Sequence, residues 1–513
     1  MEKKFRQRLF PALHKYTGLL TLAFCIWMAV SGILLNHPQL LKSYSLPNRL
    51  MPANYQYANW NRMSWRDAVF SGTDANILYV GGREGVWRSL DQGKSFHPLR
   101  QGFPRTPYDQ DTFSLLLTSR DGQETLYAGT RAGLFRWREA DGWQALGTKF
   151  FAGHSVVDVI RVEDRILAFT DSAAYQARLD QEPPLFQPLA LPRKEQQPPR
   201  VPLFRWLLKL HDGSLWGLPG RLGVDIIGLA LLFLSFSGLL LWYVKWRRKA
   251  RRKTLFSGKW FAFHYRWHLK LGILAALLIA ITTLSGMLVR PPLLIAIVNF
   301  SVPAAWMPDL DPENPWAGRI QRATWMRGRK KLVIATRQGL FAGPADGSAP
   351  FVHVPDTVPI HAMGATVFKT LDHDSLLIGS FSGLFLWNTR DGIVIQLKSR
   401  ARLGVPDWGR SLLVTGVAIF DDKPLLVADY NEGLKVLRQD NWLEPVMPAE
   451  IGSQSRISLW NALFELHNGR IFEEYLGPLY WLIIPTGGLA LLIILATGIP
   501  GWMSRRRKHQ PRT

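Results

Sequence analysis

Four histidines recur at matching places in the two halves of this 513-residue chain. His14 lies at the start of LHKYTGLLTLAFCIWMAVSGILLNHP, and His268 lies at the start of its counterpart, WHLKLGILAALLIAITTLSGMLVRPP. His211 and His467 open a second pair of stretches, LHDG…SG and LHNG…TG. An ionisable side chain beside a hydrocarbon layer is costly and indicates function. Two imidazoles that face each other can supply both axial ligands of a b-type haem.

The repeat predicts how these histidines pair. Both halves keep the same order of elements, which indicates a pseudo-twofold axis along the membrane normal. On that symmetry His14 faces His268 near the inner surface, and His211 faces His467 near the outer surface. We therefore predict two b haems with these four histidines as ligands of the iron. The alternative is that the histidines are interface residues bonded to lipid headgroups.

Three further residues are alternates without a counterpart in the other half. His264 lies one helical turn before His268 and could replace it as the inner ligand. His37 could bind a haem propionate or belong to the outer site. Arg221 is another candidate for a propionate, although an ion pair with Asp225 in the same helix is the simpler interpretation.

Glycines lie on the same helix faces as the histidines. A flat porphyrin needs a helix surface without side chains, so these glycines are candidates for haem packing. Close packing between membrane helices through small residues is the alternative. The inner set is Gly18, Gly272, Gly238 and Gly498, and the outer set is Gly32 and Gly286.

Four segments are apolar over the ~20 residues that a helix needs to cross a bilayer. They lie at 17–36, 222–244, 271–290 and 478–502. Basic residues gather at the N-terminus, at 245–253 and at 504–508, all on one side of a four-span arrangement. The positive-inside rule makes that side cytoplasmic. The net charge of +23 therefore indicates topology rather than nucleic-acid binding. The lone Cys25 excludes an intramolecular disulfide.

The two long segments between the spans show the alternation of β-strands. ILYVGGREGVWRSL (77–90) and TLYAGTRAGLFRW (125–137) are similar to LVIATRQGLFAG (332–343) and LLIGSFSGLFLW (376–387). Their glycines recur at about the length of a propeller blade, 40–50 residues. Three blades cannot close a ring, so we predict one six-bladed propeller from both segments, with two small sandwiches as the alternative. SLDQGKSF (89–96) matches the Asp-box turn of sialidase-like propellers, and we expect no catalytic side chain.

The predicted fold is membrane α + β. A four-helix transmembrane bundle is built from two parallel repeats, and an extracytoplasmic β-propeller-like domain is formed by two inserted segments. The predicted segments are 1–37 (cytoplasmic N-terminus and first span), 38–200 (first propeller half), 201–245 (interfacial helix and second span), 246–266 (basic cytoplasmic loop), 267–291 (third span), 292–455 (second propeller half), 456–503 (interfacial helix and fourth span) and 504–513 (basic cytoplasmic tail).

The membrane stretches resemble the PepSY-associated transmembrane family of bacterial iron-regulated inner-membrane proteins. The resemblance is carried, in this order, by LHKYTG…SGILLNHP, LHDGSLWGLPGR…SGLLLW, FHYRWHLKLG…LSGM and ELHNG…ATG. It implies membrane-bound b haems held by His14, His268, His211 and His467. It also implies, for some members, reduction of ferric iron carried by siderophores. The β-rich segments depart from the family, because they look like propeller blades rather than PepSY modules.

We expect an electron-transfer protein of a bacterial inner membrane, with both termini in the cytoplasm. The cytoplasmic parts are too short for a flavin or nicotinamide domain, so quinol or a separate reductase is the expected donor. The expected acceptor is a ferric siderophore, another ferric chelate or a periplasmic redox protein, which makes the chain a haem-dependent ferric reductase. The alternative is a non-enzymatic scaffold that binds a periplasmic partner. Transport is disfavoured, because few charges lie within the spans.

Overall fold

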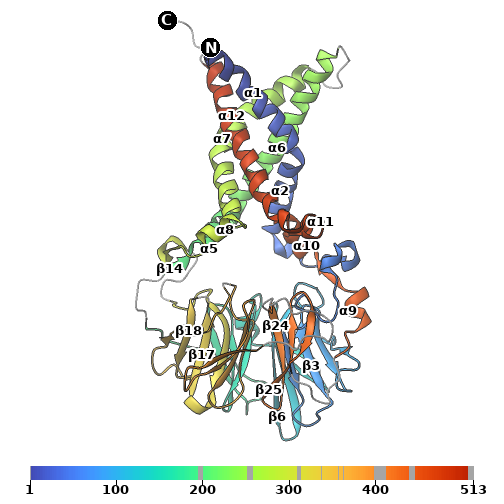
Figure 1. Ribbon diagram of the computed structural model, residues 1–513, viewed down its shortest axis with the longest axis vertical. Coiled ribbons are helices and arrows are strands. Elements are labelled where there is room, and N and C mark those ends of the chain that lie inside the picture. Colours follow the sequence, from blue (N-terminus) through green and yellow to red (C-terminus); the bar gives the residue numbers. More distant parts are fainter. Residues whose placement is uncertain are drawn as a thin grey trace. The chain divides into compact units, whose positions relative to one another are not determined.

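The computed structural model describes residues 2–194, 200–250, 258–308, 314–336, 338–355, 358–361, 363–397, 412–437 and 445–506 (Figure 1). The chain forms two compact units. The first comprises Met1–Leu41, Pro198–Leu310 and Leu459–Thr513, and the second comprises Lys42–Gln197 and Asp311–Ser458.

Long apolar helices dominate the first unit. α6 (Gly217–Lys249) and α7 (Gly258–Leu288) are each long and apolar enough to cross a membrane, and so is the segment Arg470–Pro500, which contains most of α12 (Ile483–Arg506). At most 22% of the most apolar window of each helix is buried within the protein. An apolar surface that stays exposed all round a helix is what a lipid environment requires.

The first apolar segment is bent, whereas the sequence predicted one span at 17–36. It consists of α1 (Glu2–Leu20) and α2 (Leu22–Leu35), whose axes differ by 60°. The hydroxyl of Thr21 donates to the carbonyl oxygen of Thr17 at 2.9 Å. A threonine bonded back to the preceding turn bends a helix. The described residues therefore contain three helices that can span a membrane, or four if this bent pair is one span.

The long helices pack side by side (Figure 1). α7 contacts both α6 and α12, while α1 packs on α12 and α2 packs on α6. Two short helices pack against the long ones. α5 (Leu203–Asp212) contacts α7, and α10 (Leu459–His467) contacts α2. The unit also contains α3 (Pro38–Leu41), α8 (Leu293–Ile297), α11 (Glu473–Leu476) and the antiparallel pair of β14 (Arg200–Pro202) and β15 (Ser301–Pro303).

The LH-(D/N)-G sequences end α5 and α10. Gly213 and Gly469 both adopt φ = 76°, a left-handed conformation that terminates a helix and that glycine adopts without strain. His211 and His467 therefore lie in the last turns of the two short helices.

Small antiparallel sheets make up the second unit. In chain order, the sheets are β2 (Asp67–Phe70), β3 (Leu78–Gly82), β4 (Gly85–Ser89) and β5 (His97–Pro98); β6 (Thr112–Arg120), β7 (Gln123–Thr130), β8 (Gly133–Arg138) and β9 (Gly142–Leu146); β10 (Asp158–Val162), β11 (Arg165–Phe169), β12 (Ala174–Arg178) and β13 (Gln187–Leu189); β16 (Ile320–Met326), β17 (Lys331–Thr336), β18 (Gly339–Gly343) and β19 (Val352–Val354); β20 (Val367–Thr370), β21 (Ser375–Ser380), β22 (Gly383–Asn388) and β23 (Val394–Leu397); and β24 (Val414–Phe420), β25 (Lys423–Asp429) and β26 (Gly433–Val436). A further pair joins β1 (Ser45–Pro47) to β27 (Arg456–Ser458), and α4 (Thr148–Phe151) and α9 (Ala449–Ser453) are short helices.

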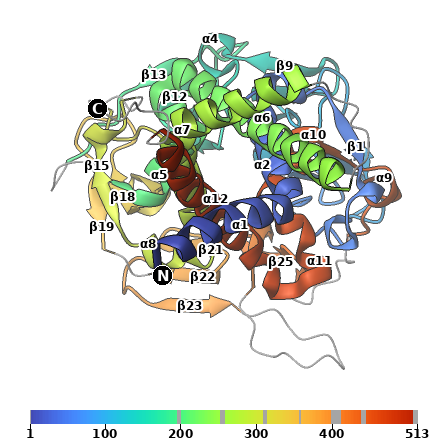
Figure 2. The ribbon, with the colours of Figure 1, turned by 90° about the horizontal axis from the view of Figure 1, so that it is seen from above.

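These sheets have a propeller-like arrangement around a common centre (Figure 2). The first strands contact one another in the order β2, β6, β10, β16, β20 and β24, and β24 returns to β2. One core between the two long segments contains Phe169 and Leu332, and another contains Trp87 and Leu426. Because both segments share these cores, they form one unit rather than two separate sandwiches.

The Asp-box sequence forms the turn after β4, as predicted. The Oδ1 atom of Asp91 accepts hydrogen bonds from the Ser89 hydroxyl at 2.8 Å and from the Ser95 backbone N–H at 2.9 Å. Hydrogen bonds from the Ser95 side chain and backbone lower the pKa of Asp91 to about 2. Phe96 is buried, with its ring centre 4.9 Å from that of Trp60. These contacts make the motif a folding element.

Candidate functional site

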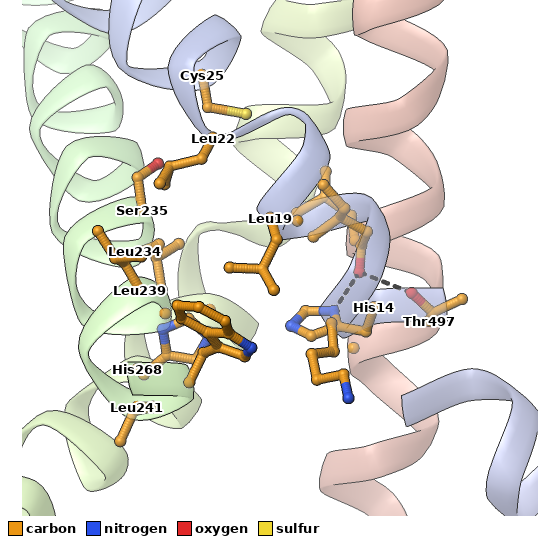
Figure 3. A pocket seen from close by; sticks show the side chains of 18 of the residues that line it. His14, Leu19, Leu22, Cys25, Leu234, Ser235, Leu239, Leu241, His268 and Thr497 are labelled. Carbon is orange, nitrogen blue, oxygen red and sulfur yellow. Dashed lines mark hydrogen bonds between the residues drawn. The ribbon is translucent and has the colours of Figure 1, made fainter. Parts of the chain in front are cut away.

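His14 and His268 lie on either side of a cavity in the first unit. His14 belongs to α1 and His268 to α7, and their ring centres are 6.3 Å apart with an interplanar angle of 85°. Both rings line a cavity of about 530 Å³. Figure 3 shows the two side chains entering it from opposite sides. The remaining lining is mainly leucine, isoleucine and glycine, so the cavity suits a large apolar ligand.

His211 and His467 form a second facing pair. Their ring centres are 6.0 Å apart and their planes differ by 49°. The two residues come from α5, which ends at Asp212, and α10, which begins at Leu459. These helices are far apart in the sequence, so only the tertiary fold brings the two histidines together. The structure thus places all four repeated histidines in the two pairs that the repeat predicted.

Each of the four rings is held at Nδ1 by a different helix. His14 bonds to the carbonyl oxygen of Ile494 at 2.9 Å, and His211 bonds to that of Thr282 at 2.8 Å. The other two bond to serine hydroxyls: His268 to Ser237 at 2.8 Å and His467 to Ser31 at 2.7 Å.

These partners determine which ring nitrogen carries the proton. A carbonyl oxygen only accepts, so Nδ1 of His14 and His211 must donate. The hydroxyls of Ser31 and Ser237 already donate to backbone carbonyl oxygens at 2.7 Å and 3.2 Å, so their oxygens are left to accept from Nδ1. In a neutral imidazole the lone pair then lies on Nε2. Anchoring Nδ1 in this way is the usual arrangement for a histidine that binds a metal through Nε2.

Four glycines, each in a Ser-Gly or Thr-Gly pair of a long helix, make room for the histidine rings. A Cβ atom at Gly286 would lie 2.6 Å from Cε1 of His211, and one at Gly498 would lie 3.3 Å from Cε1 of His14. Gly32 and Gly238 would each place a Cβ 3.4 Å from Cε1 of the facing histidine, His467 and His268 respectively. The sequence assigned these four glycines to haem packing, whereas in the structure their nearest neighbours are the histidines.

Gly18 and Gly272 differ from the other glycines. Both line the cavity between His14 and His268. A Cβ at Gly18 would meet no atom within 4 Å, and one at Gly272 would meet only Leu234, at 3.7 Å. These two positions keep the cavity wall open where the two glycines line it.

The two pairs would each hold the iron of a haem by their imidazoles, His14 with His268 and His211 with His467. The ring centres of the two pairs lie 6.3 Å and 6.0 Å apart. No group of three or more His, Cys, Asp or Glu side chains suited to a metal ion occurs among the described residues. Each pair supplies two imidazole ligands, so a metal ion held there would need further ligands from a cofactor.

Lys15, Lys245 and Tyr265 are among the polar side chains that line the cavity. The Nζ atom of Lys245 lies 6.0 Å from the centre of the Tyr265 ring. Two ammonium groups beside an apolar cavity can neutralise two carboxylates, which is the charge that the propionates of a haem carry. The sequence prediction did not include these residues.

The three alternates occupy other positions. His264 stacks against Phe233 and Trp260, with ring centres 5.7 Å and 5.4 Å apart, and its Nδ1 has no hydrogen-bond partner among the described residues. His37 donates a hydrogen bond from Nε2 to Oδ2 of Asp225 at 2.8 Å.

The contacts of Asp225 differ from the ion pair with Arg221 that the sequence predicted. Its carboxylate also accepts a hydrogen bond from Asn36 at 3.0 Å, and no ion pair joins it to Arg221 in the part of the chain that the structure describes. Two residues that directly follow α2 therefore satisfy this buried carboxylate. The expected pair within α6 does not form, because Asn36 and His37 occupy the Asp225 side chain.

The sequence analysis also missed the function of the residues before the glycines. Ser31, Ser237, Ser285 and Thr497 each precede a glycine that faces a histidine. Their recurrence as (S/T)-G was visible in the repeats, but a hydroxyl on an apolar helix commonly bonds only to its own backbone. Ser285 and Thr497 bond in this way, whereas Ser31 and Ser237 also contact a histidine of another helix, and that second contact requires the tertiary structure.

A comparison with protein families decides the family. The profile of the PepSY-associated TM region matches residues 1–245 and 188–505. The chain belongs to the PepSY-associated TM family. The family is named for its transmembrane region, and the paired histidines lie among the apolar helices of this membrane protein.

No curated protein matches the sequence. Among solved structures, the chain is similar to the extracellular domain of a hybrid two-component system from B. thetaiotaomicron, with 11% identity, a TM-score of 0.35, and coverage of 74% of this chain and 33% of that one. It is also similar to the Cps50 (Swd1) β-propeller domain of Myceliophteria thermophila (9% identity, TM-score 0.32, covering 74% and 86%) and to the dihydro-haem d1 dehydrogenase NirN (10% identity, TM-score 0.27, covering 82% and 69%). This member of the PepSY-associated TM family therefore spans about a third of the length of the first of these structures.

Proposed function

We propose that this PepSY-associated TM protein is a b-type di-haem electron-transfer protein. The observation that carries the proposal is that four histidines form two facing pairs, each ring anchored at Nδ1 and presenting Nε2. His268 and Thr282, which bonds to His211, are separated by about 21 Å of rise along α7. One pair thus belongs to each end of the apolar stretch, as a path across a bilayer requires.

The topology that we propose has four spans, with α1 and α2 together forming the first. The basic segments around α1, after α6 and after α12 then lie in the cytoplasm of a bacterial inner membrane. The unit of small sheets lies in the periplasm, where its two segments build a six-bladed propeller. The two halves of the helical unit form a bundle of parallel repeats.

The side chains divide the work of holding the cofactor. His14 and His268 would bind the inner haem, and His211 and His467 the outer one. Ser31 and Ser237 keep two of the rings in the tautomer with a lone pair on Nε2, and the open wall at Gly18 and Gly272 admits the macrocycle. Lys15 and Lys245 would balance the propionate charge. A bound haem supplies one-electron chemistry.

Electrons would pass from the cytoplasmic half to the periplasmic half. We propose quinol or a separate reductase as the donor. The proposed acceptor is a ferric siderophore or another ferric chelate, with a periplasmic redox protein as the other possibility. The family resemblance supports the ferric acceptor, and the chain would then be a ferric reductase.

The first experiment is a dithionite-reduced minus oxidised spectrum of detergent-purified protein, with the ratio of haem to protein. About two haems per chain are expected in the wild type, and about one in His211→Ala. Reoxidation of the reduced protein by a ferric chelate, followed at the same absorption bands, tests the acceptor. Protein expressed with ample haem that contains none would refute the proposal.

A non-enzymatic scaffold is the second candidate. Its support is the large propeller-like unit, an architecture that commonly binds partner proteins. On this proposal the histidine pairs only join helices. His14→Ala and His211→Ala would then reduce stability without changing any visible absorption.

A further inference from the structure

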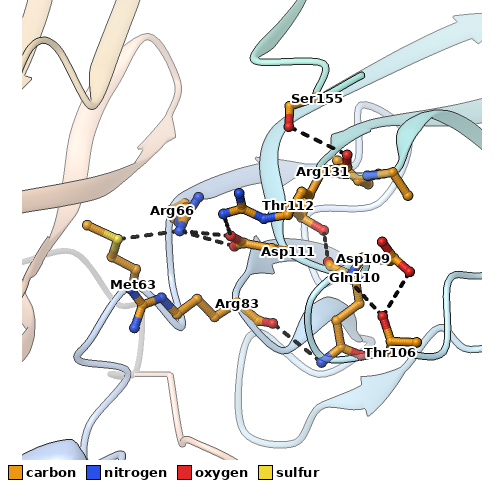
Figure 4. A network of polar contacts seen from close by, with 12 residues as sticks. Met63, Arg66, Arg83, Thr106, Asp109, Gln110, Asp111, Thr112, Arg131 and Ser155 are labelled. Atoms are coloured by element: carbon orange, nitrogen blue, oxygen red, sulfur yellow. Dashed lines mark hydrogen bonds and ion pairs between the residues drawn. The ribbon is translucent and has the colours of Figure 1, made fainter. Parts of the chain in front are cut away.

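Arginines of the second unit gather around one carboxylate. Arg66 directly precedes β2 and Asp111 directly precedes β6, while Arg131 lies in the turn between β7 and β8. The start of a first strand and the turn between the second and third strands lie at the same end of an antiparallel sheet. Two neighbouring sheets therefore bring these residues together, and Figure 4 shows Arg66 and Arg131 converging on Asp111.

The contacts around Asp111 are short and partly buried. An amino group of Arg131 lies 2.6 Å from Oδ2 of Asp111, and an amino group of Arg66 lies 3.0 Å from Oδ1. The side chain of Asp111 is 7% exposed and that of Arg66 is 10% exposed, whereas Arg131 is 30% exposed. Asp111 and Arg66 are thus the buried members of the cluster, and Arg131 is the one that solvent reaches.

Positive charge exceeds negative charge here. Arg83, in the turn between β3 and β4, and Arg322, near the start of β16, are close enough to Arg66 to repel it. Burial, the largest cause, lowers the pKa of Arg66 to about 10 together with the charges of Arg83, Arg131 and Arg322, while the Asp111 carboxylate opposes the shift. Three guanidinium groups, those of Arg66, Arg83 and Arg131, thus lie around the single carboxylate of Asp111, and Arg322 adds a fourth positive charge near Arg66.

Neighbouring carboxylates do not remove this excess. Asp67 accepts the ammonium group of Lys369 at 3.0 Å and a backbone N–H of Leu115 at 2.8 Å. Asp158 accepts from Ser114 and from the backbone of Ala323 while lying near Arg322 and Lys369. Counting these and Glu84, a buried carboxyl group near Arg83 and Asp111, five cations face four carboxyl groups.

A second observation points to a ligand. The Nε–H group of Arg66 is buried and has no hydrogen-bond acceptor among the described residues. Aromatic rings hold the guanidinium planes, since Arg66 lies 4.8 Å from the centre of Phe113 and Arg131 lies 4.9 Å from that of Tyr108. A guanidinium stacked on a ring keeps its N–H edge available for a carboxylate.

We propose that this cluster, defined by Arg66, Arg83, Asp111 and Arg131, binds an organic polycarboxylate anion, either free or as a metal chelate. Arginine pairs carboxylates with two parallel hydrogen bonds, and an excess of positive charge at a partly dehydrated site strengthens the attraction. The site itself is independent of haem binding. Its further meaning, that the ferric acceptor is an anionic chelate, rests on the proposed function.

Isothermal titration of the full chain in detergent with citrate and with gallium(III) citrate tests the site. Gallium replaces iron, so no electron transfer complicates the titration. Both probes are expected to bind the wild type, and added salt should weaken binding. Tighter binding of the gallium complex would identify a chelate site, while equal binding would identify a site for the free anion.

The variants Arg131→Gln and Arg83→Gln should each weaken binding at least about tenfold, which corresponds to about 1.4 kcal/mol. Arg178→Gln is the matched control, because Arg178 is exposed and pairs with Asp180 on another sheet. Size-exclusion and thermal-unfolding profiles establish that each variant is folded.

Unchanged affinity in both folded variants, or no binding to the wild type, would overturn the inference. So would tighter binding of a positively charged gallium(III) hydroxamate complex than of gallium citrate. The haem content of the same samples separates this result from the proposed function. Haem without anion binding refutes the site alone, whereas anion binding without haem refutes only the electron-transfer proposal.

Discussion

The Nδ1 atom of His268 lies 2.8 Å from the hydroxyl oxygen of Ser237. At the repeat-related position, His14 bonds instead to the carbonyl oxygen of Ile494, which also accepts the hydroxyl of Thr497 at 3.2 Å. Two related histidines are thus anchored by a side chain in one case and by the backbone in the other. A substitution of the hydroxyl residue therefore affects them differently.

Ser237→Ala removes the acceptor of His268, whereas Thr497→Ala leaves the acceptor of His14 in place. A hydrogen bond of this kind contributes about 1 kcal/mol, and loss of such a partner lowers metal affinity ~10–100-fold. We expect Ser237→Ala to lose haem faster than the wild type when apomyoglobin is added as a haem acceptor. Equal loss rates in Ser237→Ala and Thr497→Ala would contradict this assignment.

His268→Ala and His264→Ala distinguish the inner ligand from its neighbour. Only His268 faces His14, while His264 stacks on Phe233 and Trp260. We therefore expect His268→Ala to contain about one haem per chain and His264→Ala to retain about two, as measured by pyridine haemochrome and protein assay. The assignment fails if the two variants exchange these results.

Gly286→Ala tests whether the His211 ring needs the space that the missing side chain of Gly286 leaves. The new methyl group would lie 2.6 Å from Cε1 of His211, so the ring or the helix must shift. Overpacking of this kind costs about 1–3 kcal/mol. We expect the reduced spectrum of the outer haem to change or disappear, while the inner haem remains.

Gly32→Ala is the matched control for that prediction. Its methyl group would lie 3.4 Å from Cε1 of His467, a distance that needs only a small adjustment. The effect should be clearly weaker than that of Gly286→Ala. A spectrum that is equally disturbed in both variants would mean that the two glycines do not act through the histidine contacts.

Glu84 predicts a pH dependence of stability in the second unit. Burial raises its pKa from an ordinary value of 4.5 to about 7, although a hydrogen bond from Tyr57 opposes the shift. The folded state therefore holds this proton more tightly than the unfolded state. The stabilising contribution is complete below pH 4.5 and is lost as the pH rises through 7.

Glu84→Gln carries the uncharged form at every pH. Relative to the wild type, we expect it to raise the apparent melting temperature at pH 8 by roughly 2 °C, which corresponds to about 1 kcal/mol. The difference should vanish near pH 4.5 in differential scanning fluorimetry. A difference that is constant with pH would show that Glu84 is not the group responsible.

Much of the candidate site could be predicted from the sequence because its chemistry is repeated. An imidazole at the end of an apolar segment is conspicuous by itself, and its recurrence in the second half indicated which histidines pair. The alternation of apolar residues likewise predicted the strands of the second unit. Both signals are periodic along the chain, and periodicity follows from the geometry of a single helix or strand.

Other features were decided only by the tertiary structure, since they depend on contacts between distant residues. The sequence shows Asp225 one turn after Arg221, but the structure gives its carboxylate to His37 and Asn36 of another segment. Thr21 bends the first apolar segment through a local hydroxyl contact that the apolar pattern does not reveal.

The sequence by itself therefore determined the apolar spans, the β-rich segments and the four repeated histidines. The tertiary structure decided that Gly286 accommodates His211, that Ser237 orients His268, and that Arg66 and Arg131 converge on Asp111. The physical reason is that burial and periodicity are properties of one element, whereas hydrogen-bond partners and steric clearance are properties of two elements packed together.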